Sequence, residues 1–300
     1  MKTTLLILAA GMGSRYGGLK QLDSIDEAGH TMLDYSVYDA IQAGFNSIVF
    51  VIRKEFESEF KEKISEKFKS LIAIEHAFQS IEDLPNKFQC PSDRKKPWGT
   101  AHAVWSARAI IQNPFAVINA DDFYGRDAFY RMHNFCTQIA SENNAALEAG
   151  LITYALKNTL SAHGSVNRGI CSIQNGQLYS VEEYTDITSE TNGTIRGTDS
   201  KGESLELQQD ALVSMNFWGF CPHIFHALEL FLLRFLENFG HLENSECYLP
   251  SAIDDLIQKK HLTCQSLKTD ATWLGVTYPN DKQKIQKALN EIRKTEHYFE

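Results

Sequence analysis

Short apolar runs alternate with longer amphipathic segments over the first half of the chain. The run at residues 5–10 is unbroken, as expected of a strand buried on both faces. Residues 32–43 carry apolar side chains at helical spacing, and Gly44 follows where a helix would end. This alternation predicts parallel strands covered by helices. Strands are expected at 5–10, 47–52, 71–78 and 115–120, and helices at 32–43, 55–70, 101–111 and 127–141.

The second half has a different texture. Residues 147–156 alternate as a strand, and residues 163–186 have the pattern of short strands joined by turns, one of them at Asn175-Gly176. Residues 185–210 are polar and rich in Thr, Ser and Gly, which predicts an exposed arm or a mobile hairpin. Further strands are expected at 212–220, 262–267 and 272–277, and helices at 224–239, 248–259 and 280–297.

These elements predict an α/β fold: a Rossmann-like, doubly wound mixed sheet, mostly parallel, in three α/β/α layers with an accessory β-rich half. We find no internal repeat and no linker long enough to separate domains. Residues 1–300 are therefore expected to form one domain with two halves, 1–125 and 126–300. The Phe-rich helix at 224–239 could be core or a subunit contact, so a homo-oligomer is possible.

Composition excludes several classes of function. The net charge of −9 argues against non-specific binding of nucleic acid, for which a basic face is expected. The six cysteines form no Cys-x-x-Cys pair, so zinc or thiol-redox spacing is absent and reduced thiols are expected. No apolar stretch approaches the roughly 20 residues of a membrane helix. The first apolar run leads into Gly-Met-Gly, not a signal cleavage site. We expect a cytoplasmic protein with no membrane partner.

A glycine-rich turn with two cations follows the first strand. Residues 5–20 read Leu-Leu-Ile-Leu-Ala-Ala-Gly-Met-Gly-Ser-Arg-Tyr-Gly-Gly-Leu-Lys. Gly11 and Gly13 let backbone N–H groups approach an anion, because no Cβ stands in the way. Arg15 and Lys20 can neutralise a phosphate chain, and Arg15 can do so with a bidentate fork. The third glycine of a dinucleotide fingerprint and the Gly-Lys-Ser/Thr of a P-loop are absent. The segment predicts a loop that handles a triphosphate.

The same string resembles the Leu-Ala-Ala-Gly-x-Gly-Ser/Thr-Arg…Lys signature of the nucleotidyltransferase superfamily, which includes the sugar-nucleotide pyrophosphorylases. The resemblance is strong over 5–125 and moderate over 160–280. It implies transfer of a nucleotidyl group from a nucleoside triphosphate to a phosphorylated small molecule bound by the second half, with release of pyrophosphate. It also implies that Arg15 and Lys20 are catalytic and that Ala9, Ala10, Gly11 and Gly13 bind the nucleotide.

A second motif occupies residues 97–104, Pro-Trp-Gly-Thr-Ala-His-Ala-Val. Thr100 is a candidate helix N-cap, and Gly99 would let a planar ring lie on bare backbone. The string resembles the Leu-Gly-Thr-Ala-His-Ala-Val motif of the pyrophosphorylases, in which this turn reads the nucleobase. Gln79 matches the family glutamine that hydrogen-bonds the base, although the segment separating it from Gly99 is longer than usual. His102 is interpreted as a packing residue.

A pair of acids closes the fourth predicted strand, in the sequence Asn119-Ala120-Asp121-Asp122. A carboxylate at the carboxyl end of a strand can hold Mg²⁺ together with phosphate oxygens. The resemblance implies that Asp121 is the Mg²⁺ ligand. Asp122 could help through a water molecule or cap the following helix.

The sugar-contacting segments of the family are matched more loosely. The resemblance implies that Gly164, Glu183 and Asn216 contact the acceptor. Tyr184 stands where the family usually has a lysine near the sugar phosphate, and Gly275 stands where it has a second metal-binding aspartate. Three residues could compensate for these departures: Arg168 for the lysine, and Asp270 or Asp281 for the aspartate.

The leading hypothesis is a Mg²⁺-dependent enzyme that makes an NDP-sugar from an NTP and a sugar 1-phosphate. The short gap between Arg15 and Lys20 keeps a first alternative open, a cytidylyltransferase for alditol or amino-alcohol phosphates or a guanylyltransferase for the molybdenum cofactor. The departures at Tyr184 and Gly275 keep a second open, a regulatory protein that binds a nucleotide sugar without turnover.

Overall fold

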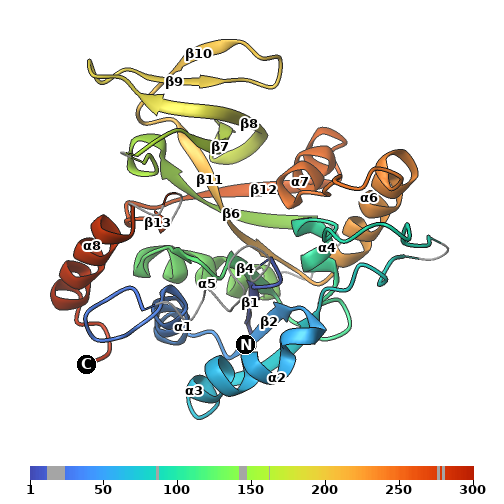
Figure 1. The fold of residues 1–300 in the computed structure, drawn as a ribbon, viewed down its shortest axis with the longest axis horizontal. Coiled ribbons are helices and arrows are strands. Elements are labelled where there is room, and N and C mark those ends of the chain that lie inside the picture. The colour runs from blue at the N-terminus through green and yellow to red at the C-terminus, as the bar shows by residue number, and fades with distance from the viewer. Residues whose placement is uncertain (12–23, 86–87, 142–146, 162, 276–277, 279–280) are drawn as a thin grey trace.

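The computed structural model describes residues 1–11, 24–85, 88–141, 147–161, 163–275, 278 and 281–300 (Figure 1). The strands are β1 (Thr4–Leu8), β2 (Ser47–Ile52), β3 (Ala73–Phe78), β4 (Phe115–Asn119), β5 (Asp122–Phe123), β6 (Leu147–Ala155), β7 (Val166–Gln174), β8 (Gln177–Ser189), β9 (Ile195–Thr198), β10 (Ser204–Leu207), β11 (Leu212–Phe220), β12 (Leu262–Lys268) and β13 (Leu274–Gly275). The α-helices are α1 (Met32–Ala43), α2 (Glu57–Phe60), α3 (Glu66–Phe68), α4 (Thr100–Trp105), α5 (Arg126–Ser141), α6 (Ile224–Phe239), α7 (Leu249–Gln258) and α8 (Asp281–Thr295).

Eleven strands of the described residues form one mixed sheet in the order β10-β9-β8-β12-β6-β11-β4-β1-β2-β3, with β7 paired to β11 and β8. The N-terminal strands β4, β1, β2 and β3 are parallel, as expected. Beyond β4 the sheet is antiparallel except for β12 beside β6. The expectation of a mostly parallel sheet therefore holds for the first half only. The second half is built from hairpins, as in the turn between β7 and β8, where Asn175 and Gly176 both have positive φ.

Helices cover both faces of this sheet. Along β1, Leu5 and Ile7 point into one core and Leu6 into the other, because successive side chains of a strand alternate between faces. The first core also contains side chains of α1, α2, α3 and α5, and the second contains side chains of α4, α6 and α7. The result is the expected three-layer arrangement (Figure 1).

Two predicted helices differ from expectation. The stretch expected at 55–70 is helical but irregular, because a π segment, Lys61–Ser65, separates α2 from α3. The helix expected at 101–111 ends at Trp105 and continues as turns. By contrast, α6 has the predicted bounds, and its side chains Ile224, Leu228, Leu232 and Leu236 are buried in the core.

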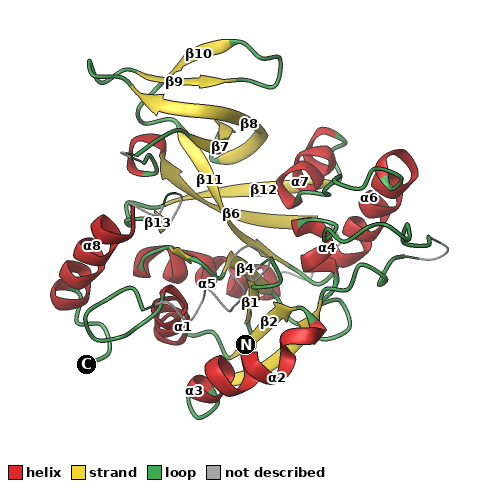
Figure 2. Ribbon diagram, in the orientation of Figure 1, coloured by secondary structure: helices red, strands yellow, loops and turns green. Residues whose placement is uncertain are grey.

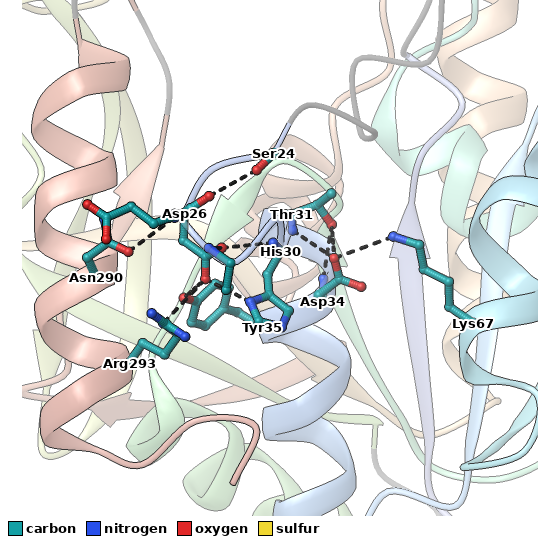
Figure 3. A network of polar contacts seen from close by, with 11 residues as sticks. Ser24, Asp26, His30, Thr31, Asp34, Tyr35, Lys67, Asn290 and Arg293 are labelled. Carbon is teal, nitrogen blue, oxygen red and sulfur yellow. Dashed lines mark hydrogen bonds and ion pairs between the residues drawn. The ribbon is translucent and has the colours of Figure 1, made fainter.

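A polar network ties the segment before α1 to the C-terminal helix (Figure 3). The buried carboxylate of Asp26 accepts hydrogen bonds from the Tyr35 hydroxyl at 2.7 Å and from the backbone N–H of His30 at 2.8 Å. His30 Nδ1 lies 2.8 Å from the same carboxylate, and Arg293 of α8 lies 3.7 Å from it. These bonds hold the pKa of Asp26 below its usual range, against the opposing effect of burial. The C-terminal helix α8 thus contacts the segment between residue 24 and α1.

The polar segment at 185–210 forms the expected hairpin. β9 pairs with β8 and β10 pairs with β9, and Figure 2 shows this arm beyond the helices at the upper end of the molecule. Among the described residues no helix is both long and apolar enough to cross a membrane.

Candidate active site

A cavity of about 580 Å³ lies at the carboxyl end of β4, where the parallel strands meet the antiparallel half. β4 contributes Asn119 and β5 contributes Asp122. The opposite wall comes from β7, β8 and β11, and the rim comes from the starts of α4 and α7. The lining residues are Thr100, Asn119, Asp122, Asn167, Arg168, Gly169, Val181, Glu183, Ser214, Met215, Asn216, Tyr248, Pro250, Ser251, Trp273 and Gly275.

Two amides and a carboxylate are joined across this cavity. Asn119 Nδ2 donates to Asp122 Oδ2 at 2.9 Å, and Asn216 Nδ2 donates to Asn119 Oδ1 at 2.8 Å. Asn216 Oδ1 in turn accepts from Trp218 Nε1 at 3.0 Å. Asn216 has φ of 64°, within an irregularity of β11 that turns its side chain toward β4. The predicted acceptor residue Asn216 is therefore held rigidly beside the acidic end of β4.

Asp121, the predicted metal ligand, and its neighbour Asp122 have different surroundings. Asp121 is exposed, whereas Asp122 lines the cavity. Burial, together with the neighbouring charge of Asp121, raises the pKa of Asp122 to about 7. Hydrogen bonds from Asn119 and Tyr124 oppose that shift. A cation beside these carboxylates would relieve their repulsion, so the donor set fits Mg²⁺.

Gly275 lies beside Asp122, because the two residues pair between β13 and β5. A Cβ at Gly275 would lie 2.7 Å from Asp122 Oδ1 and 2.5 Å from the Trp273 ring. The indole thus fills the space that a larger residue would need. Among the described residues no group of three or more His, Cys, Asp or Glu side chains could hold a metal. A bound Mg²⁺ would therefore depend on Asp121, Asp122 and oxygens of the substrate.

The acceptor side combines the predicted residues Glu183 and Asn216 with Gly169, which the sequence did not single out. Glu183 lines the cavity, and Gly169 lies opposite it in the β7–β8 register. A Cβ at Gly169 would lie 2.8 Å from Val181 Cγ1, so the packing of β7 against β8 leaves no room for a larger residue there. Gly164 is not among the lining residues, and the Tyr278 ring packs over it instead. A glycine within a predicted strand is a signal that could have pointed to Gly169.

The side-chain amide of Gln79 is held by contacts with Gly99 and His102 at the start of α4. Its Nε2 donates to the Gly99 carbonyl at 3.0 Å and lies 3.1 Å from His102 Nδ1. Because a carbonyl can only accept, Nε2 must be the atom that faces Gly99. His102 Nδ1 is therefore an acceptor, and its Nε2 donates to the Asp83 carbonyl at 2.7 Å. Burial lowers the pKa of His102, which keeps it neutral. His102 is a packing residue, as interpreted, and it also orients Gln79.

Gly99 and Thr100 hold this turn by contacts that the sequence did not reveal. Gly99, not Thr100, is the N-cap of α4. The Thr100 hydroxyl instead accepts from the Leu249 N–H at 2.9 Å, which ties α4 to the start of α7. Gly99 has φ of 98°, and a Cβ there would lie 2.5 Å from the Cys247 carbonyl oxygen. That side of Gly99 is therefore covered by protein and offers no platform for a ring.

The start of the glycine-rich segment lies next to the acids. Ala9 and Ala10 are buried, Gly11 is exposed, and the Ala120 N–H donates to the Leu8 carbonyl at 3.2 Å. The ends of β1 and β4 are thus adjacent. Gly13, Arg15 and Lys20 lie outside the described residues.

These features agree with a match to a known family. Residues 4–183 match the nucleotidyl transferase family. The chain belongs to this family. A search among curated proteins finds no match.

Solved structures of nucleotidyltransferases share the fold over nearly the whole chain. A protein provisionally assigned as a glucose-1-phosphate thymidylyltransferase from Bacillus anthracis, in complex with sucrose, has 13% identity and a TM-score of 0.63 over 97% of this chain and 96% of its own. The inositol-1-phosphate CTP transferase of T. maritima has 10% identity and a TM-score of 0.60 over the same shares. A UDP-glucose pyrophosphorylase complexed with UDP-glucose has 16% identity and a TM-score of 0.57 over 98% of this chain and 100% of its own. At these identities the likeness is one of fold.

Proposed function

We propose that this protein transfers a nucleotidyl group from a nucleoside triphosphate to a sugar 1-phosphate, giving an NDP-sugar and pyrophosphate. The main support is the convergence of Asn119, Asp122, Glu183 and Asn216 on one cavity. That cavity lies at the carboxyl end of β4, and ligands of open α/β sheets bind outside the carboxyl ends of the strands. Membership of the nucleotidyl transferase family supplies the class of reaction.

The nucleobase binds beside Gln79 at the turn that contains Gly99 and Thr100, away from the side of Gly99 that Cys247 covers. Both amide hydrogens of Gln79 are directed at protein acceptors, so its Oε1 is the atom left for a ligand. No donor among the described residues reaches that oxygen. Oε1 would accept a hydrogen bond from an N–H group of the base.

The acceptor binds against β7, β8 and β11. The Glu183 carboxylate can accept from a pair of hydroxyl groups, and the second amide hydrogen of Asn216 can donate to another. Gly169 also lines this wall, opposite Glu183 in the β7–β8 register. A polyhydroxylated acceptor suits this wall.

Asp121 and Asp122 would hold Mg²⁺. When bound, the ion neutralises phosphate charge and orients phosphate oxygens. Asn119 fixes the Asp122 carboxylate through its 2.9 Å hydrogen bond. Because Mg²⁺ commonly uses one or two carboxylates together with substrate phosphates, the lack of a carboxylate at Gly275 does not preclude this site.

Catalysis would be positioning and charge stabilisation. The acceptor phosphate attacks the α-phosphorus in line as the bond to pyrophosphate breaks, and no covalent enzyme intermediate is needed. Arg15 would stabilise charge on the α-phosphoryl group and on the departing pyrophosphate, and Lys20 would bind the triphosphate.

The test is a screen for pyrophosphate release. CTP, UTP, dTTP, GTP and ATP are each combined with sugar 1-phosphates, inositol 1-phosphate, alditol phosphates and amino-alcohol phosphates, with Mg²⁺ and with EDTA. Turnover of a sugar 1-phosphate with Mg²⁺ is expected. Turnover of only inositol, alditol or amino-alcohol phosphates would show that the proposed acceptor class, the sugar 1-phosphates, is wrong.

The space filled by Trp273 beside Gly275 favours a second candidate, a protein that binds a nucleotide sugar without turnover. Calorimetry with UDP-glucose and CDP-glucose would then give saturable binding, while no pair in the screen releases pyrophosphate.

A further inference from the structure

Arg168 is a buried cation that forms no ion pair with a described carboxylate. The residue is only 9% exposed. Its Nε donates to the Thr159 hydroxyl at 3.3 Å, its Nη2 to the Thr159 carbonyl, and its Nη1 to the Asn167 carbonyl at 2.8 Å. All three acceptors are neutral. No described carboxylate lies within 4 Å of its nitrogens. Buried charges are normally paired, but this guanidinium has no directly bonded anion, and the charges of Asp122 and Glu183 act on it only from farther away.

Arg168 lines the candidate active site. Arg168 is the one cation among the described residues that line the 580 Å³ cavity. Its Cζ lies 5.0 Å from the centre of the Trp273 ring, and the three hydrogen bonds leave one hydrogen on each Nη. The group is therefore held in place with donors to spare. Burial lowers the pKa of Arg168, while the charges of Asp122 and Glu183 oppose that shift.

The register of the β7–β8 hairpin places Arg168 directly opposite Tyr184, and Gly169 directly opposite Glu183. Residues opposite each other in an antiparallel pair have Cβ atoms roughly 5 Å apart on one face. A charge carried by residue 168 can therefore serve a ligand that lies over residue 184. Arg168 and Glu183 both line the 580 Å³ cavity, so a ligand with hydroxyl groups at Glu183 can bring an anionic group to Arg168.

We propose that Arg168 binds the phosphate of the acceptor and makes an anionic acceptor a requirement of this site. This deepens the proposed function and rests on it for the identity of the ligand. The anion site itself does not depend on turnover. A second cavity of about 410 Å³ shares Arg168 and Trp273 with the first, and Lys284 lines only the second. Lys284 therefore provides a matched control.

The first experiment measures binding of inorganic phosphate to the full chain without nucleotide. Arg15 and Lys20 are both replaced by Gln, so that phosphate cannot bind there. In this background Arg168→Gln is expected to weaken phosphate binding roughly 10- to 100-fold, the range for a hydrogen bond to a charged group. Lys284→Gln is expected to leave it unchanged. Equal binding by Arg168→Gln and its background, or a loss that follows Lys284, would overturn the proposal.

Rescue separates a role in binding from a role in folding. Adding Tyr184→Lys to Arg168→Gln puts a cation back on the opposite strand, and it is expected to restore most of the phosphate affinity that Arg168→Gln loses. If Arg168→Gln does not fold, Arg168→Lys and Arg168→Met are compared instead. Arg168→Lys keeps the positive charge and is expected to bind phosphate, whereas the neutral Arg168→Met is expected not to bind it. Should rescue fail in a folded variant, the proposal is wrong.

The second experiment uses the acceptor found by the pyrophosphate screen. Arg168→Gln is expected to raise the KM for that acceptor by roughly 10- to 100-fold, with the KM for the NTP unchanged. Equal changes in both values would indicate a general structural effect and contradict the assignment. If no pair turns over and phosphate binding still depends on Arg168, the proposed function fails and the anion site stands.

Discussion

Replacing Gln79 with Glu tests whether the hydrogen bonds of its amide hold the turn proposed to bind the nucleobase. In Gln79→Glu the donor Nε2 becomes an oxygen that faces the Gly99 carbonyl at 3.0 Å and His102 Nδ1 at 3.1 Å. Two hydrogen bonds are lost, and the new carboxylate oxygen then faces two other acceptors, the Gly99 carbonyl and His102 Nδ1, at a buried position. At roughly 1 kcal/mol for each bond and 1–3 kcal/mol for a buried group left unpaired, the free energy of unfolding should fall by about 3–5 kcal/mol.

This deficit should depend on pH. A protonated His102 could donate from Nδ1 to the introduced carboxylate and from Nε2 to the Asp83 carbonyl. The new carboxylate therefore raises the folded-state pKa of His102, which burial lowers in the wild type. A raised histidine pKa adds stability at low pH that is lost as pH rises through it. The deficit should shrink on acidification by up to about 1.4 kcal/mol per pH unit.

Urea denaturation of the wild type and of Gln79→Glu across the range from about pH 6 to pH 9 measures the effect. Gln79→Met is the control, because it removes both donors without adding a charge. It should lose stability by an amount that does not vary with pH relative to the wild type. If Gln79→Glu unfolds at the wild-type midpoint at every pH, the amide is not held as described, and its use in base recognition loses its structural basis.

Three further predictions concern the site and its support. Arg15→Ala should lower kcat by roughly 10²–10³, by analogy with loss of an oxyanion-hole donor, with an unchanged circular dichroism spectrum; full activity would remove Arg15 from catalysis. Gly275→Asp should lower stability by about 1–3 kcal/mol without raising activity, because its Cβ would meet Trp273 and Asp122; a more active enzyme would contradict this. Burial raises the pKa of Asp39 to about 7, so the folded state binds more protons than the unfolded state between about pH 4 and pH 7, and stability falls as pH rises there. Asp39→Asn should remove that contribution and gain stability relative to the wild type from about pH 5 to pH 8, measured by urea denaturation; a constant difference would refute the assignment.

Local pattern alone determined the elements with strong periodicity. The expected bounds of the helix at 32–43, the strand at 47–52, the strand at 212–220 and the helix at 224–239 are those of α1, β2, β11 and α6. These segments have a continuous apolar face, which is encoded by neighbours in the chain. Membership of the nucleotidyl transferase family was also legible in short strings, because phosphate-handling turns need their glycines and cations close together in sequence.

The tertiary structure alone decided which of these residues meet. The β7–β8 register puts Gly169 opposite Glu183, whereas the sequence suggested Gly164 for the same wall. It also brings Arg168 opposite Tyr184, and long-range packing turns the Thr100 hydroxyl toward α7. Such contacts depend on strand register and on packing between segments far apart in the chain. A shift of one residue in register would move every side chain of a strand to the other face, and neighbouring residues in the sequence carry no record of that choice.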